Sequence, residues 1–314
     1  SMPFAVVIDT TAPAKPTIDT ITDDVPLYVG GIDKTASTND TTPTLNGKAE
    51  AGSTVTISDN GTALGTALAD VNGNWTFTPS KALADGQHSF TVVATDPLGN
   101  QSTASDSYDI TISTTPPAQP TLDAIYDDVP GSVGNLTNGQ LTNDNLPTLS
   151  GTGSEGNVIH ILDNGVQIGT AIVSGGVWSF TPTTVLSDGV HNLRIYANDD
   201  AGNVSTTTPV FAITVDATAP ATPAVTGVLD DVGSITGQIA ASGRTDDNRP
   251  TLSGTGDAGT TIHIKDGANE IGTAVVTAGG TWTFTPTANL ADGLHSLVIT
   301  ATDPAGNTST GSTT

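Results

Sequence analysis

The chain has 314 residues, of which 32 are Asp or Glu and only 8 are Lys or Arg, for a formal net charge of −24. This charge opposes binding to nucleic acid or insertion into an anionic membrane, so a charged partner should be cationic. The sequence has no Cys and no apolar run of about 18 residues, which excludes disulfide-stabilised domains and a membrane-spanning helix.

The acidic residues are strongly biased toward aspartate. Only Glu50, Glu155 and Glu270 are glutamates, which leaves 29 Asp. Aspartate is a poor helix former that favours turns and sites for hard cations. Together with 35 Gly and 19 Pro among many Val, Ile and Thr residues, this composition predicts short strands joined by turns and no helix.

Three tandem copies of one unit account for nearly the whole chain. Trp75, Trp178 and Trp282 are 103 and 104 residues apart, and each begins a Trp-(Thr/Ser)-Phe-Thr-Pro motif. A period near 100 residues fits a complete domain rather than one turn of a solenoid. We therefore expect repeats at 10–113, 114–216 and 217–314, the last with a truncated final strand. Residues 1–9 would be the end of a preceding repeat, behind a cloning remnant, Ser1 and Met2.

Hydrophobic alternation predicts about seven strands in each repeat. In the first repeat they are expected at 16–22, 44–49, 54–58, 63–69, 74–78, 88–95 and 106–112. Within 54–58, for example, Val55 and Ile57 share one face. Seven short antiparallel strands in about 100 residues predict an all-β fold, with tandem immunoglobulin-like β-sandwich domains in a linear rod.

A long segment between the first two predicted strands of each repeat is bracketed by aspartates, and we call it the acidic loop. A structureless link of about 15 residues is unusual unless a ligand orders it. Ca²⁺ takes 6–8 oxygen ligands, so these acids predict a calcium site in each loop. Alternatively, the acids only end a strand and begin a turn. The predicted ligands are Asp23, Asp24 and Asp40; Asp127, Asp128 and Asp144; and Asp230, Asp231, Asp246 and Asp247.

A second group of acids is expected at the opposite end of each sandwich, where consecutive domains join. Carboxylates from three separate segments would repel one another without a cation, so we expect a calcium ion shared between neighbouring repeats. In the first linker Ser113 replaces the acid, so the site there is expected to be weaker or rearranged. These ligands are Asp9, Glu50 and Asp96; Ser113, Glu155, Asp199 and Asp200; and Asp216, Asp257 and Asp303. An all-oxygen site does not distinguish Ca²⁺ from Mn²⁺.

Other repeated motifs have simpler interpretations. The Asp-Asn-Gly motifs at Asp59 and Asp163 predict hairpin turns. Asp85, Asp188 and Asp292 would form turns before the sixth strand, from which one of them could reach the next interface. The histidines that follow them are expected to pack or hydrogen-bond rather than bind zinc. The tryptophans are expected in the core, with an exposed sugar-stacking platform as the alternative. No catalytic constellation stands out, so an enzyme is not expected.

Four motifs carry a family resemblance: Asp-x-x-x-Pro at the linkers (Asp9 to Pro13, Asp216 to Pro220), Pro-Thr-Leu-x-Gly, Asp-Asn-Gly and Asp-Gly-x-His. The chain resembles the bacterial Ig-like repeats of giant type-I-secreted adhesins along essentially its whole length. It lacks the Cys pair of antibody domains, and its Trp lies on the fifth rather than the third strand.

The resemblance implies a secreted or cell-surface protein that supports adhesion and virulence. The leading hypothesis is a monomeric, calcium-stiffened stalk whose main partners are the neighbouring repeats of the same chain. The alternatives are that these domains themselves form a tip that binds a host glycoprotein or glycan, or that they are an accessory module of a secreted carbohydrate-active enzyme. An exposed Trp or a domain-specific pocket would favour the tip.

Overall fold

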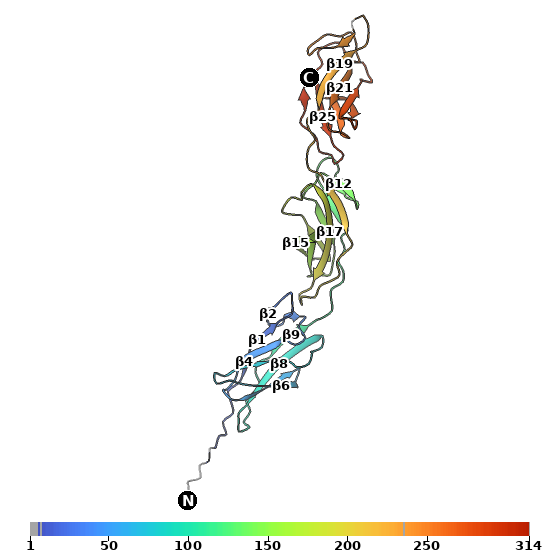
Figure 1. Cartoon of the computed structure of the whole chain (residues 1–314). Coiled ribbons are helices and arrows are strands. Elements are labelled where there is room, and N and C mark those ends of the chain that lie inside the picture. Colours follow the sequence, from blue (N-terminus) through green and yellow to red (C-terminus); the bar gives the residue numbers. More distant parts are fainter. Residues whose placement is uncertain (1–5, 7, 235, 314) are drawn as a thin grey trace.

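The computed structural model describes all residues except 1–5, 7, 235 and 314; Ser1 and Met2 therefore lie outside the described residues. Three β-sandwiches follow one another end to end in an elongated arrangement, from the blue and cyan first repeat to the orange and red third repeat (Figure 1). The described residues form strands and turns, and no helix long and apolar enough to span a membrane is found among them.

Each repeat consists of two sheets. In the first repeat, one sheet has the order β2-β1-β4-β7 and the other has the order β3-β9-β8-β5-β6. The strands are β1 (Thr17–Asp23), β2 (Gly30–Ile32), β3 (Ser37–Thr38), β4 (Thr44–Lys48), β5 (Thr54–Asp59), β6 (Thr62–Leu68), β7 (Asn74–Phe77), β8 (Gly86–Thr95) and β9 (Tyr108–Ile112). All seven predicted strands are present, within about two residues of their expected bounds.

The second repeat has the same topology, with sheets β11-β10-β13-β16 and β12-β18-β17-β14-β15. Its strands are β10 (Ala124–Asp127), β11 (Gly134–Asn135), β12 (Gln140–Thr142), β13 (Thr148–Thr152), β14 (Val158–Asp163), β15 (Val166–Ile172), β16 (Val177–Phe180), β17 (Gly189–Asn198) and β18 (Phe211–Val215).

In the third repeat the sheets are β20-β19-β21-β24 and β23-β22-β25-β26. Its strands are β19 (Ala224–Asp230), β20 (Gly237–Gln238), β21 (Thr251–Thr255), β22 (Thr261–Asp266), β23 (Asn269–Val275), β24 (Thr281–Phe284), β25 (Leu297–Thr302) and β26 (Ser312–Thr313).

The inward faces of the two sheets form one apolar core in each repeat. Val55 and Ile57 are fully buried on the same face of β5, as the alternation predicts. The three tryptophans are only 2–3% exposed and belong to the three cores. The prediction of core tryptophans is confirmed, and the exposed sugar-stacking platform is wrong because the sandwich encloses the rings.

The acidic loop is not structureless, contrary to the prediction. In the first repeat its β2 returns antiparallel along β1, pairing Ile32 with Ile21, and its β3 runs parallel to β9, pairing Ser37 with Thr111. The loop thus crosses from one sheet to the other. Strands of two or three residues are too short to show hydrophobic alternation, so the sequence pattern does not reveal them.

The predicted turns and histidine contacts are also present. Asn60 and Gly61 have φ of 47° and 79° and form the two-residue hairpin between β5 and β6. His88 lies within hydrogen-bond distance of Asp59 Oδ2 (2.7 Å) and the Ala84 carbonyl (2.8 Å). These histidines hold the start of β8 and its counterparts, so their role in the fold is structural.

Candidate metal sites at the ends of the repeats

Two acids of each acidic loop are buried in every repeat. The buried pairs are Asp23 with Asp40 (4% and 2% exposed), Asp127 with Asp144 (0% and 2%), and Asp230 with Asp247 (both 5%). The second Asp of each Asp-Asp motif, together with Asp246, is exposed. The structure therefore divides the predicted loop ligands into a buried pair and an exposed remainder.

A threonine connects the two acids of each pair. In the first repeat, the Thr38 hydroxyl donates to Asp23 Oδ2 (2.5 Å), and the Asp40 amide donates to Thr38 Oγ1 (3.0 Å). Thr142 and Thr245 make the same contacts in the other repeats. These threonines end the acidic loop's crossing to the second sheet. The sequence shows that these threonines recur at equivalent positions, but it does not show which side chains they contact.

Each buried acid also accepts from a nearby backbone amide. Val25 N donates to Asp23 Oδ1 (2.7 Å), and Thr42 N donates to Asp40 Oδ1 (2.8 Å). The first acid thus lies at the end of β1 and the second begins a turn. Both positions agree with the alternative in which these acids only end a strand and begin a turn. Some side-chain oxygens of the acidic loop accept none of these hydrogen bonds.

Among the described residues of the acidic loops, three buried side-chain oxygens have no hydrogen-bond partner. They are Asn39 Oδ1, Asn143 Oδ1 and Asp247 Oδ2. Asn143 is 7% exposed and Asp247 is 5% exposed. Asn39 and Asn143 occupy equivalent positions, directly before the second acid of each pair. A buried oxygen without a donor costs free energy, so a recurrent one is a position where a cation would be accommodated.

The charges in the acidic loop of the second repeat also favour a bound cation. Burial raises the pKa of Asp144, and the nearby charges of Asp127 and Asp128 raise it further. Ionised carboxylates held close together in a partly buried site repel one another. A bound divalent cation would remove that repulsion.

Carboxylates alone do not make a complete ligand set in these loops. Within the described part of the chain, no three His, Cys, Asp or Glu side chains are close enough to hold one ion. Calcium also accepts carbonyl and Asn oxygens as ligands. The sequence predicts a shell of these carboxylates and loop carbonyls, and the structure adds the neighbouring Asn oxygen as a candidate ligand in the first two repeats. That these groups bind calcium stays a prediction.

The acids predicted at the domain entrances are dispersed over separate partners. Glu155 accepts from Gly176 N (3.1 Å), and Asp257 accepts from the linker amide of Ala221 (2.7 Å). Asp9 accepts from Thr11 N and Asp216 from Thr218 N, both on their own linkers. Glu50 is exposed. That these acids share an ion with the preceding repeat stays a prediction.

The turn acids of this second group serve their own turns. Asp96, Asp199 and Asp303 each accept from backbone amides and from the Asn side chain that ends the turn. The Asn100 side chain is the largest cause of the lowered pKa of Asp96. The ionised form of Asp96 is therefore stabilised by its own turn.

The same Asn residues hold the linkers, a role that the sequence interpretation missed. Their Nδ2 atoms donate to linker carbonyls: Asn100 to Asp9 (3.2 Å), Asn203 to Ser113 (2.8 Å) and Asn307 to Asp216 (2.7 Å). Because the acceptor is a backbone oxygen, Ser113 serves as well as Asp216. The repetition of Asn was the only signal in the sequence, which does not show what this side chain contacts.

Each linker is also hydrogen-bonded to an Asp of the preceding repeat. Asp85 accepts from Thr114 N and Oγ1 (3.2 and 2.8 Å). Asp188 accepts from Ala217 N (2.8 Å) and Thr218 Oγ1 (2.5 Å). These acids reach the inter-domain linker, as one of their two interpretations anticipated. Each linker is thus held by both flanking domains.

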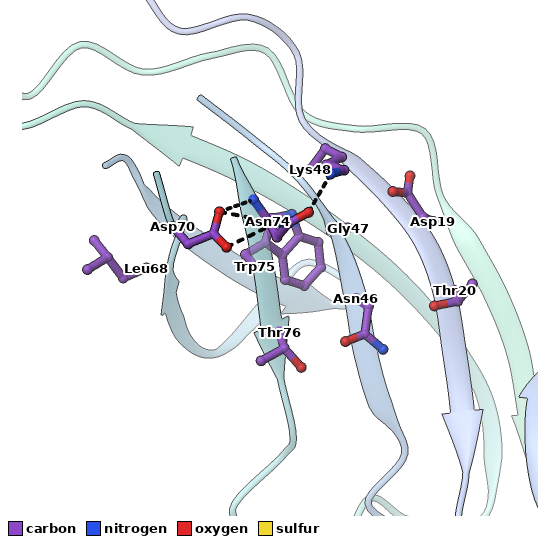
Figure 2. A pocket seen from close by; sticks show the side chains of 10 residues that line it. All are labelled: Asp19, Thr20, Asn46, Gly47, Lys48, Leu68, Asp70, Asn74, Trp75 and Thr76. Carbon is purple, nitrogen blue, oxygen red and sulfur yellow. Dashed lines mark hydrogen bonds between the residues drawn. The ribbon is translucent and has the colours of Figure 1, made fainter. Parts of the chain in front are cut away.

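The first repeat also has a polar pocket, which the motif analysis did not anticipate (Figure 2). Its volume is about 490 Å³, and its lining includes Asp19, Asn46, Lys48, Asp70, Asn74 and Trp75. Lys48 Nζ donates to the Asn74 side chain, which in turn donates to Asp70. Most of these side chains differ from their counterparts in the other repeats, for example Ser150 and Thr152 at the positions of Asn46 and Lys48.

The indole nitrogen of Trp75, at this pocket, is buried without a partner. The equivalent nitrogens donate to backbone carbonyls: Trp178 to Thr121 (3.1 Å) and Trp282 to Thr255 (3.2 Å). The first repeat therefore combines this pocket with a buried donor that has no hydrogen-bond partner.

Sequence comparison agrees with this architecture. The profile of the bacterial Ig-like domain matches residues 16–114, 123–217 and 222–314. The chain belongs to the bacterial Ig-like domain family. Its fold is accordingly all-β, with one Ig-like sandwich in each matched segment. Among curated proteins, no sequence matches the chain.

Several solved structures resemble this bacterial Ig-like chain at low identity. The fibronectin(III)-like modules of Clostridium thermocellum CbhA are 18% identical, with 64% of this chain and 94% of that chain covered and a TM-score of 0.36. A tetra-tandem repeat from the extending region of a large adhesion protein is 22% identical (96% and 73% covered, TM-score 0.28). The BSP domain of a biofilm associated protein is 13% identical (96% and 65% covered, TM-score 0.22).

Proposed function

We propose that this bacterial Ig-like chain is a non-enzymatic spacer segment of a secreted or surface-bound adhesin, stiffened by calcium at the ends of its repeats. Export by a type I system and a role in virulence belong to the same proposal. The observation that carries it is the buried acid pair beside a buried, partnerless Asn oxygen, found in equivalent loops of the first two repeats. The third loop has a corresponding acid pair and the partnerless Asp247 oxygen.

The position of these loops links ion binding to stiffness. A Cβ on Gly306 of the third repeat would lie 3.0 Å from Gly131 Cα and 3.5 Å from Asn143 Nδ2 of the second. The second acidic loop is therefore in contact with the following domain. An ion ordering this loop would fix the surface on which the next sandwich rests, which proline in the linker alone cannot do.

Thermal unfolding of the whole chain, with excess calcium and with chelator, tests this proposal. We expect clearly higher melting temperatures with calcium, because the ion binds the folded loops and not the unfolded chain. Asp144→Asn should reduce the calcium-dependent increase, whereas Asp123→Asn, which removes an exposed acid from the same repeat, should leave it intact. Equal melting temperatures with calcium and with chelator would refute the metal hypothesis.

The polar pocket supports a second candidate, in which the first repeat binds a host glycan or glycoprotein. Asn, Asp and Lys side chains are suited to sugar hydroxyls, and all three types line this pocket. Glycan-array binding and NMR shifts should locate a ligand at Asn46 and Lys48. Replacing both with the residues of the second repeat (Asn46→Ser, Lys48→Thr) should abolish the shifts. Binding that survives the exchange would argue against this pocket.

A further inference from the structure

Besides the linker contacts, two side-chain hydrogen bonds among the described residues join the acidic loop of the first repeat directly to the second repeat. Asn198 Nδ2 at the end of β17 donates to the Tyr28 hydroxyl (2.8 Å), and Ser37 Oγ donates to Asp200 Oδ2 (3.1 Å). Tyr28 and Ser37 belong to the acidic loop of the first repeat. Asn198 and Asp200 lie at the adjoining end of the second. Together these four residues form what we call the junction latch.

The latch residues do not follow the repeat. At the second junction, Ser132 and Leu141 stand where the first repeat has Tyr28 and Ser37. Thr302 and Pro304 stand where the second repeat has Asn198 and Asp200. The bond between Asn198 and Tyr28 cannot form in the same way there, since Thr302 has no amide group and Ser132 has no aromatic ring. The other bond cannot form because Leu141 has no hydroxyl and Pro304 no carboxylate. Both sides of the latch are thus specific to one junction.

Contacts within the second repeat hold its side of the latch in place. Asn198 is 2% exposed, and its Oδ1 lies 2.5 Å from His160 Nε2. The His160 ring is stacked on Tyr196 at a centroid distance of 4.6 Å. With Oδ1 accepting from His160, the Nδ2 group donates to the Asp199 carbonyl and to Tyr28. His160 is therefore a positioning residue for the latch.

The shape of the turn completes the surface. A Cβ on Gly202 would lie 3.2 Å from the Tyr28 ring and 3.5 Å from Asn39 Nδ2. Glycine at this position, with φ of +91°, lets the turn lie directly against the loop. The contact therefore combines two hydrogen bonds with close packing of an aromatic ring.

We propose that this end of the second repeat is a docking surface specific for the acidic loop of the first repeat, and that the junction latch holds these two domains together without a cation. This inference goes beyond the calcium proposal, because it assigns a metal-independent interaction to one junction. It also fixes which repeat can precede the second one. A repeat with Ser at the Tyr28 position would lack the ring and its hydroxyl.

Distance measurements between spin labels in the whole chain test the latch, and the absence of native Cys makes labelling specific. Exposed, equivalent positions after β5, β14 and β22 provide matched pairs: Thr62→Cys with Val166→Cys for the first junction, and Val166→Cys with Asn269→Cys for the second. In chelator, we expect a narrow distance distribution across the first junction. The same distribution should broaden in Tyr28→Phe/Asn198→Thr and in Ser37→Ala.

Asn198→Thr introduces the residue of the other two repeats, and Ser132→Ala is the matched control, which removes a hydroxyl at the position equivalent to Tyr28. The control should leave both distributions unchanged. Two results would overturn the latch proposal. One is a distance distribution across the first junction that is as broad in chelator as that across the second, and the other is a wild-type width in the latch variants. If calcium affects neither junction but the latch variants broaden the first, the calcium proposal fails and the latch stands.

Discussion

The two junctions of the chain use the same linker contacts but different domain contacts. At both, an Asn of the following turn holds a linker carbonyl, and an Asp of the preceding repeat holds linker amides or hydroxyls. The first junction adds the Tyr28 and Ser37 latch, whereas the second brings Gly131 and Gly306 into close backbone contact. Repeated residues therefore make the linker contacts, whereas the direct contacts between domains involve residues that differ between the two junctions.

The largest effect is expected from closing the glycine contact at the second junction. Gly306→Ala places a Cβ 3.0 Å from the Gly131 backbone, where no side chain can move aside, at φ of +101°. The backbone conformation alone should cost about 1–2 kcal/mol, and the clash should displace the third repeat. Melting temperature and label distances across the second junction measure the two effects.

Two equivalent glycines provide matched controls for this prediction. Gly99→Ala has a similar φ of +94° but nothing within 4 Å of its Cβ, so it should show the backbone cost alone. Gly202→Ala meets the ring of Tyr28, which can shift, and should be intermediate. An equal loss in all three variants would show that the inter-domain contact contributes nothing.

The next largest effect should come from the Asn residues that hold the linkers. Asn307→Ala removes the donor to the Asp216 carbonyl and a bond to Asp303. We expect it to broaden the second junction strongly, while Asn203→Ala broadens the first less because the latch remains. Each loss should correspond to about 1 kcal/mol for a neutral bond and more for the one to the carboxylate. Equal broadening of the distance distributions across the two junctions would contradict a latch that supports the first junction alone.

Much of this organisation could be predicted from the sequence, because the same motifs recur three times. The strands, the buried tryptophans and the hairpin at Asn60 follow from alternation and turn chemistry. The short strands β2 and β3 could not be predicted, since two or three residues show no period. Nor could the partner of Asn203, because its acceptor is a backbone oxygen about 90 residues away in sequence. The four latch residues were detectable only as departures from the repeat.

A smaller effect is expected from acidification at the second linker. Hydrogen bonds from Ala217 N and the Thr218 hydroxyl hold the pKa of Asp188 below its ordinary value of 3.8. A carboxyl whose pKa is lowered on folding stabilises the fold above its unfolded pKa and loses that contribution as pH falls through the folded value. The second junction should therefore loosen below about pH 4.

NMR titration of the Asp188 carboxyl carbon, together with label distances across the second junction, would measure this response. Asp188→Asn should remove that part of the pH dependence. Because other acids also titrate in this range, the comparison between wild type and variant carries the result. A distance distribution with the same pH dependence in both would show that the Asp188 grip does not constrain the linker.

The smallest effect is expected from exchanging the residues that distinguish the two linkers. Ser113 N donates to Thr38 O, and its carbonyl accepts from Asn203, as the backbone of Asp216 does with Thr142 and Asn307. Ser113→Asp should therefore keep the linker path and add only a carboxylate near the acids of the following turn. We expect a slightly higher calcium affinity at the first junction and slightly lower stability in chelator, because like charges repel.

The reciprocal Asp216→Ser should weaken calcium binding at the second junction, which has no latch to compensate. The distance distribution across the second junction should therefore broaden more in Asp216→Ser than the distribution across the first junction narrows in Ser113→Asp. Calorimetric titration of both variants would measure the change in calcium affinity, and label distances across both junctions would measure the change in width. Equal and opposite changes in width would mean that the linker acid, rather than the latch, makes the two junctions different.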